Sequence, residues 1–170
     1  MPIRTLGPDN AAAFHSLRLR GLKEFPGAFA SSYEEEVALA VDAVAKRLEP
    51  HEARAVFGSF TGDLLCGVVG LQRESMTKLR HKAVLWGMYV APEARRSGHG
   101  AALLKHALEH AWSSLRVLQV NLGAHTQNED ALRLYRNHGF EVFGTEKGSL
   151  LVNGSLQDEF HMVCRLKRVA

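Results

Sequence analysis

The segment from Lys82 to Ala124 constrains the fold most, because its hydrophobic period changes twice. Lys82 to Val90 has the apolar, β-branched composition of a strand, residues 100–112 carry apolar side chains at helical spacing, and Val117 to Ala124 alternates again. Two strands joined by a helix lie parallel in one sheet, with the helix crossing one face. The sequence therefore predicts one parallel pair of strands.

The flanking segments predict a mixed sheet around that pair. Before it, we expect a strand, two helices and a hairpin; after it, a helix and two strands joined by a polar loop through Asn153. The order is β-α-α-β-β-β-α-β-α-β-β, an α/β (α+β) fold with a mostly antiparallel sheet. The expected elements are strands Ile3–Leu6, 55–60, 64–73, 140–145 and 159–166, and helices 8–25, 37–48 and 128–137. One face of helix 37–48 is expected to carry the apolar residues Val37, Val41, Val44 and Leu48 toward the core, and one face of the strand 117–124 is expected to carry Leu118, Val120, Leu122 and Ala124.

Composition limits what kind of protein this is. The chain has 170 residues, 46% hydrophobic and 23% charged, which fits one folded domain over residues 1–170 and excludes a disordered chain. Two cysteines, Cys66 and Cys164, build no disulfide framework. The sequence has neither an apolar signal core nor an apolar run of roughly 20 residues. We expect a cytoplasmic protein that binds no membrane.

The net charge of +3 is a slight basic excess. Because Lys and Arg form no run, we expect no nucleic-acid partner, and the excess fits an anionic small ligand. The ligand site that the sequence favours is the loop 95–100. Its glycines, Gly98 and Gly100, allow a close approach to the backbone, the helix that follows exposes free N–H groups, and Arg95 and Arg96 can contact phosphate. Alternatively, the glycines only shape a turn and the arginines are solvated.

Two motifs together resemble a known family. Arg95-Arg96-Ser97-Gly98-His99-Gly100 is similar to the Arg/Gln-x-x-Gly-x-Gly/Ala motif of the GNAT N-acetyltransferase superfamily. The segment from Asn128 to Phe140 resembles that family's Asn-x-x-Ala-x-x-Leu-Tyr-x-x-x-Gly-Phe signature. The expected element order matches the family's fold over nearly the whole chain. The resemblance implies a splayed central sheet and transfer of an acetyl group from acetyl-CoA to an amine, without a metal.

The resemblance also implies a role for particular residues. It places the coenzyme's pyrophosphate on residues 95–101 and its pantetheine arm along the preceding strand. Asn128 would contact the arm, although asparagine is also a good helix N-cap and both roles are compatible. Tyr135 would protonate the departing thiolate, the alternative being a core aromatic. The expected coenzyme-binding residues are Met88, Tyr89, Val90, Arg95, Arg96, Ser97, Gly98, His99, Gly100, Ala101, Asn128 and Tyr135.

The general base is where the sequence departs from the family. Many relatives carry a glutamate on the strand before the glycine loop, whereas the corresponding positions here, Leu85 to Gly87, hold no acid. Glu74 at the end of the preceding strand is our candidate. His81, Glu34 and His125 are the alternatives.

The resemblance also implies an acceptor groove built by residues 25–36 and 147–157. Phe29, Tyr33 and Glu34 are its candidate residues, and Tyr33 and Glu34 would favour a cationic amine. Glu34 to Glu36 are otherwise interpreted as solvated charges at a helix start, where the helix dipole favours acids.

Two function classes remain open at this point. The first is an N-acetyltransferase acting on a small amine or a protein amino group by direct attack in a ternary complex. The second is a non-catalytic acyl-CoA-binding module or sensor of the same fold. His106 and His110 have ligand-like spacing, but no third ligand accompanies them, so we expect no metal site. A homodimer through an edge strand is compatible with the last two strands.

Overall fold

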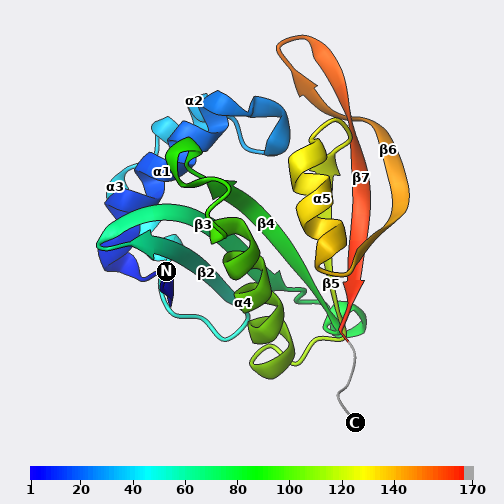
Figure 1. Ribbon diagram of the computed structural model, residues 1–170, viewed down its shortest axis with the longest axis horizontal. Helices are drawn as coiled ribbons and strands as arrows, with labels where there is room; N and C mark the ends of the chain where they lie inside the picture. Colours follow the sequence, from blue (N-terminus) through cyan, green and yellow to red (C-terminus); the bar gives the residue numbers. More distant parts are fainter. Residues whose placement is uncertain (167–170) are drawn as a thin grey trace.

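A computed structural model describes residues 1–166 and shows a seven-stranded sheet covered by helices on both faces (Figure 1). The strand order is β1-β2-β3-β4-β5-β7-β6, and the pair β4–β5 is parallel while the other neighbours are antiparallel. The predicted mixed, mostly antiparallel sheet is confirmed. The strands are β1 (Ile3–Thr5), β2 (Arg54–Thr61), β3 (Leu64–Arg73), β4 (Lys82–Val90), β5 (Gln119–His125), β6 (Phe140–Val152) and β7 (Ser155–Arg165).

The helices divide between the two faces of the sheet. α4 (His99–Ser113) and α5 (Glu129–Asn137) share a core with one face, while α1 (Ala11–Glu24) packs on the other with α2 (Tyr33–Val37) and α3 (Val41–Arg47). Short 3₁₀ turns are η1 (Pro8–Asn10), η2 (Pro26–Ala28), η3 (Thr77–Leu79) and η4 (Pro92–Ala94). In the part of the chain described, no helix is both long and apolar enough to cross a membrane.

Three local expectations were wrong. The predicted second helix is two short ones, and Val37 and Val41 are exposed rather than facing the core. Leu118 lies before β5 and is half exposed, whereas Val120 and Leu122 are buried as expected.

The polar loop of the C-terminal half is a tight turn at Asn153 and Gly154, both of which have positive φ. The long hairpin β6–β7 continues on either side of this turn, so residues 147–157 are mostly paired strand. Lys147 Nζ and the backbone N–H of Gly148 both donate to the Asp158 carboxylate, which fastens the hairpin beside a bulge in β6.

The parallel pair is short. Only Lys82, Ala83 and Val84 of β4 pair with β5, opposite Gln119 to Asn121, and the two strands then separate. The rest of β4, from Leu85 on, keeps its pairing with β3, and the rest of β5 keeps its pairing with β7. Beyond these three residues the sheet therefore divides into two halves whose strands separate, and the region between the separated parts of β4 and β5 is here called the cleft.

A bulge in β4 lies where the cleft opens. Val68 pairs with Tyr89 and Gly70 with Trp86, so Gly87 and Met88 together stand opposite a single residue of β3. Gly87 has φ +62°, the left-handed conformation that glycine adopts most readily and that such bulges require. Ala83 and Leu85 face the α4 side, whereas beyond the bulge it is Met88 and Val90 that do so. The bulge thus reverses which residues of β4 face which side.

Candidate functional site

The cleft between β4 and β5 is bordered at its open end by the starts of two helices. β4 leads through η4 into α4, and β5 leads into α5, so both helix N-termini lie beyond the carboxyl ends of the parallel strands. In sheets with parallel strands, this edge is where ligands bind. The predicted glycine loop and the predicted Asn128 are therefore brought to the same end of the cleft.

The glycine loop presents backbone rather than side chains. Arg96 and Gly98 both have positive φ, and Gly98 is the N-cap of α4. Within residues 1–166, no protein acceptor takes a hydrogen bond from the N–H groups of residues 96–101. A Cβ on Gly100 would lie 3.3 Å from Leu134 Cδ2 and 3.6 Å from Met88 Cε. The loop backbone is thus packed against both sides of the cleft, and its free N–H groups fit an anion such as a pyrophosphate.

The two loop arginines differ in what holds them. Arg95 donates to both carboxylate oxygens of Glu24, at 2.8 and 3.0 Å, and its Nε donates to the carbonyl of Val90 at 3.0 Å. Glu24 ends α1, so this ion pair fastens the loop to α1. The Arg96 and Ser97 side chains are exposed at the mouth of the cleft. Of the expected phosphate ligands, Arg96 and Ser97 are accessible, and Arg95 is engaged by the protein itself.

His99 and Tyr89 are also turned away from the mouth. His99 is buried, with Nε2 3.4 Å from the Thr61 hydroxyl, and burial lowers its pKa. The Tyr89 hydroxyl donates to Glu24, and burial together with this hydrogen bond raises the pKa of Tyr89 to about 12. Tyr89 therefore packs on the α1 side, while Met88 and Val90 carry the cleft side of β4.

Asn128 is the N-cap residue of α5, and Tyr135 lies within that helix, which follows β5 in the other half of the sheet. The Asn128 side chain accepts a hydrogen bond from the N–H of Ala131 at 3.2 Å, so the N-cap interpretation is confirmed. Tyr135 is buried in the α4–α5 core beside Phe140, with ring centroids 5.7 Å apart. Burial raises the pKa of Tyr135 to about 12, so the hydroxyl keeps its proton at neutral pH.

On the opposite face of the sheet, the segment after α1 covers the cleft. A Cβ on Gly27 would lie 3.3 Å from the His125 ring, so η2 reaches across to the end of β5. Phe29 is buried there, Tyr33 is partly buried with Lys23 Nζ 4.3 Å from its ring centre, and Glu34 is exposed. The expected acceptor segment therefore borders the cleft, although its three candidate residues are not equally accessible.

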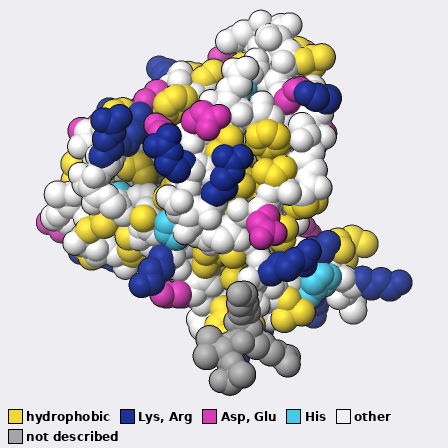
Figure 2. Space-filling view, turned by 45° about the vertical axis from the view of Figure 1, so that its right-hand side comes forward, with side chains coloured by type: hydrophobic (Ala, Val, Ile, Leu, Met, Phe, Trp, Pro, Cys, Tyr) yellow, Lys and Arg dark blue, Asp and Glu magenta, His cyan; other side chains and the backbone are white. Residues whose placement is uncertain are grey.

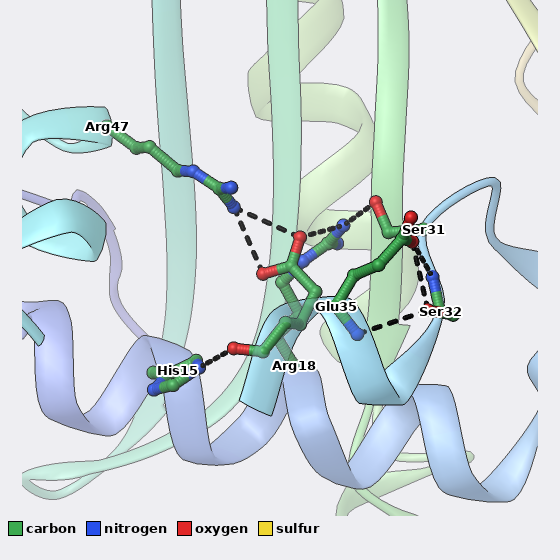
Figure 3. Close-up of polar contacts among 7 residues, drawn as sticks. His15, Arg18, Ser31, Ser32, Glu35 and Arg47 are labelled. Atoms are coloured by element: carbon green, nitrogen blue, oxygen red, sulfur yellow. Dashed lines mark hydrogen bonds and ion pairs between the residues drawn. The ribbon is translucent and has the colours of Figure 1, made fainter. Parts of the chain in front are cut away.

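Glu36 corrects the interpretation of the three glutamates as solvated charges. Glu35 caps α2 through Ser32 as a helix-start acid does, but Glu36 is only 4% exposed. Arg47 Nη1 lies 3.0 Å from both Glu36 oxygens and Arg18 Nη2 lies 3.4 Å from one (Figure 3). Burial raises the pKa of Glu36, but the two guanidinium groups outweigh burial and hold it below its usual value.

The candidate bases occupy different levels of the cleft. Glu74 follows β3, and its N–H donates to the Lys82 carbonyl at the closed end, where it lines a hollow with Gln72 and Trp86. Lys82 and Met88 are six positions apart, which is about 20 Å along an extended strand. His81 is exposed at the same closed end. The backbone of Glu74 and the exposed His81 thus lie at the closed end, whereas the hollow that Glu74 lines reaches Trp86, two positions before Met88.

Two ionisable residues lie at the open end, Glu159 and His125. The sequence did not indicate Glu159, and His125 was one of the alternative bases. The Glu159 carboxylate lies 3.5 Å from where a Cβ of Gly123 would be, past the last β4–β5 pair, and it accepts a hydrogen bond from Ser149. His125 is held by Gln157 and by the N–H of Gln127. The alternation of β7 against β5 could have indicated Glu159, because residue 159 pairs with His125.

No group of three or more metal-ligating side chains is found among residues 1–166. His106 and His110, on α4, pack edge-on against Phe57 at 4.8 and 5.1 Å between ring centres. Their spacing along α4 therefore places both histidine rings against the buried Phe57. Cys66 and Cys164 are both buried and free, as expected for small core residues.

Taken together, the structure has a mixed sheet whose parallel strands separate, with unpaired backbone amides at the open end, an arrangement that fits a ligand carrying an anionic group. The sequence model described as "Acetyltransferase (GNAT) family" matches residues 20–140, and the chain belongs to this family. Its sheet and helix arrangement is that of GNAT acetyltransferases.

Individual relatives agree with the family assignment. The L-amino acid N-acetyltransferase AaaT of Escherichia coli (strain K12) is 31% identical over 77 residues, which are 45% of this chain and 48% of AaaT. The matched part thus spans about half of that relative's length.

Two solved structures share the fold over almost the whole chain. A GNAT-family acetyltransferase from Streptococcus pneumoniae has TM-score 0.86 at 22% identity, covering 97% of this chain and 99% of its own. The putative acetyltransferase yncA from Salmonella typhimurium, solved with acetyl-CoA, has TM-score 0.87 at 20% identity, covering 100% and 96%.

Proposed function

We propose that the chain is an N-acetyltransferase that uses acetyl-CoA to acetylate a primary amine by direct attack in a ternary complex. The observation that carries this proposal is the cleft itself. β4 and β5 pair over three residues and then separate, and the unpaired amides of residues 96–101 lie at the open end. Family membership and the acetyl-CoA named with the Salmonella structure support the same co-substrate.

The glycine loop and β4 have different roles in this proposal. Bound acetyl-CoA supplies the acetyl group as an activated thioester. The amides of the glycine loop hold the phosphates, and the exposed Arg96 adds charge. The N–H of Ala91 donates to β3, so alternation along the strand directs the N–H of Val90 into the cleft. There it can pair with an extended amide chain or polarise a carbonyl oxygen.

Proton transfer needs a donor and an acceptor on the two sides of the cleft. Tyr135 holds its proton at neutral pH and lies on the α5 side, so its hydroxyl serves as the general acid for the leaving thiolate. On the covered side, Glu159 at the open end is better placed than Glu74 to take the proton of the amine. We therefore assign the base to Glu159 and use Glu74 as the comparison.

The test begins with binding and proceeds to turnover. Calorimetry with acetyl-CoA, followed by a thiol-release assay over a panel of primary amines, should show binding and turnover. Tyr135→Phe should lower kcat by about 10²-fold or more without weakening acetyl-CoA binding. Glu159→Gln should lower kcat/KM, while Glu74→Gln should leave kcat/KM unchanged. The reverse result for the two glutamates would return the base to Glu74.

The alternative is a non-catalytic acyl-CoA-binding module. Binding without turnover on any amine, and no effect of Tyr135→Phe, would favour it. No residue found in the cleft favours this alternative over the enzyme.

A homodimer also stays a prediction. The outer edge of β6 ends the sheet, and the exposed side chains nearby include Phe143, Leu151 and Leu156. Figure 2, with this side turned forward, shows hydrophobic side chains at the surface among charged ones. Light scattering of the purified protein decides the oligomeric state.

A further inference from the structure

We propose that Arg18 binds a carboxylate of the acceptor, so that the preferred acceptors are amines with a carboxylate beside the amino group, as in α-amino acids. This inference rests on the proposed acetyltransferase function and names its substrate class. It is carried by the hydrogen bonding and the position of Arg18.

Arg18 is a buried cation with unused donors. It lies on α1 and is only 7% exposed. Of its five N–H donors, only those on Nη2 have acceptors among the described residues 1–166, the Ser31 hydroxyl at 3.1 Å and Glu36 at 3.4 Å. Its Nε is fully buried and has no hydrogen-bond partner within residues 1–166. A buried donor left unpaired is costly, so an oxygen that enters here gains a charge-assisted hydrogen bond.

The guanidinium lies at the point where the cleft opens. Its Nη1 is 3.0 Å from where a Cβ of Gly87 would be, and the residue after Gly87 is Met88 on the cleft wall. The ring centres of Trp86 and Phe29 lie 5.6 and 5.8 Å from its Cζ. In an α-amino acid a single carbon separates the carboxylate from the amino group. A carboxylate held at Arg18 therefore keeps the amine beside the bulge, next to the place where β4 leaves β5.

The surrounding charges favour an anion rather than a cation. Glu36 is the buried acid of this cluster, and it is shared between Arg18 and Arg47, which leaves one excess positive charge. Glu35 is engaged by Ser32, and Glu34 is exposed on α2. A ligand carboxylate would balance the excess charge. This reverses the expectation, based on Tyr33 and Glu34, that the groove favours a cationic acceptor.

The experiment compares acceptors that differ in the carboxylate alone. Initial rates with acetyl-CoA are measured for a set of L-amino acids, for their amides and for the corresponding decarboxylated amines. For the native protein, kcat/KM should be at least ten-fold higher with the acids than with the amides. Equal rates, or a preference for the amides or amines, would overturn the proposal while leaving the acetyltransferase function intact.

Two matched variants separate binding from folding. Arg18→Gln should raise KM for the acids by about 10- to 100-fold, the usual effect of losing charged hydrogen bonds, and leave KM for the amides nearly unchanged. Arg47→Gln breaks the same cluster at its exposed end and should keep the preference for acids. Equal losses on acids and amides in both variants would show that the cluster only stabilises the fold.

A binding measurement tests the carboxylate site at Arg18 without requiring turnover. Calorimetric titration of the coenzyme A-loaded protein with L-amino acids should show binding that Arg18→Gln weakens by about 10- to 100-fold. If acetyl-CoA does not bind and no amine is acetylated, the proposed function fails. If amines without a carboxylate are acetylated and amino acids do not bind, only the carboxylate site fails.

Discussion

Removing the negative charge of Glu36 should destabilise the protein far more than its place among three consecutive glutamates suggests. The Glu36 carboxylate is 4% exposed and balances two guanidinium groups, one of them the buried Arg18. Glu36→Gln keeps the shape but leaves Arg18 without a counter-charge. Loss of one partner of a buried ion pair costs about 3–5 kcal/mol, which for a chain of this length lowers Tm by roughly 6–20 °C.

Arg47→Gln is the matched control, because it breaks the same cluster at a side chain that is 44% exposed. Its cost should be at most about 1 kcal/mol, as for exposed ion pairs. The double variant Arg18→Met with Glu36→Leu removes both buried charges and should be more stable than Glu36→Gln alone. Urea unfolding at pH 7 gives the three values. Equal losses for Glu36→Gln and Arg47→Gln, or a double variant less stable than Glu36→Gln, would refute the reasoning.

Lowering the pH should weaken the same interaction of Glu36 with the two arginines. The two arginines hold the pKa of Glu36 in the folded protein below its ordinary value of 4.5. The unfolded chain therefore binds the proton first as the pH falls. The stability that Glu36 contributes is present above about pH 4.5 and is lost as the pH falls through the folded pKa. The difference in unfolding free energy between the native protein and Glu36→Gln should shrink over that range.

Three further predictions concern the bulge, the general acid and a helix cap. Gly87→Ala should cost about 1–3 kcal/mol in backbone strain and also raise acceptor KM, because the new methyl meets Arg18; Gly62→Ala, with φ +59° and open space around it, should cost only the strain in urea unfolding. The pKa of Tyr135 is about 12 in the folded protein and 10.0 ordinarily, so the stabilisation that comes from its neutral hydroxyl is present below pH 10 and is lost as the pH rises to 12. Between these pH values the unfolding free energy of the native protein should fall by about 3 kcal/mol more than that of Tyr135→Phe. Ser32→Ala should lower the unfolding free energy by about 0.5–2 kcal/mol, seen as a lower Tm.

The features predictable from the sequence are those set by local pattern. The strand–helix–strand unit of Lys82 to Ala124, the glycine loop and the cap at Asn128 each depend on residues close together in the chain, and the structure has all three. The hydrophobic period also located the core positions of α4, such as Leu103 and Leu104. Local pattern was sufficient here because capping and amphipathicity act within one or two turns.

The features that were missed depend on partners far apart in the chain. The loop sequence around Arg95 indicates a phosphate ligand, but it does not indicate the ion pair of Arg95 with Glu24, 71 positions earlier. The sequence around Glu36 indicates a capping acid, but it does not indicate the contact with Arg18, 18 positions earlier. In each case the local charge pattern was read correctly, but the fold supplied a counter-charge that the sequence could not place. Buried charges are paired, and the identity of the partner is a property of the fold.

The bulge at Gly87 is a further feature that local pattern does not predict, because it changes which side of the sheet each later residue of β4 faces. Extrapolating the alternation of Ala83 and Leu85 would place Tyr89 on the α4 side with the coenzyme loop. With Gly87 in the left-handed conformation, Tyr89 turns to Glu24 on α1, and Met88 and Val90 turn to the cleft. The same glycine lacks the Cβ that would press on Arg18. Gly87 thus sets which later residues of β4 face the α4 side of the sheet, and it leaves room for the Arg18 guanidinium. Substitution there should affect coenzyme binding and acceptor choice together.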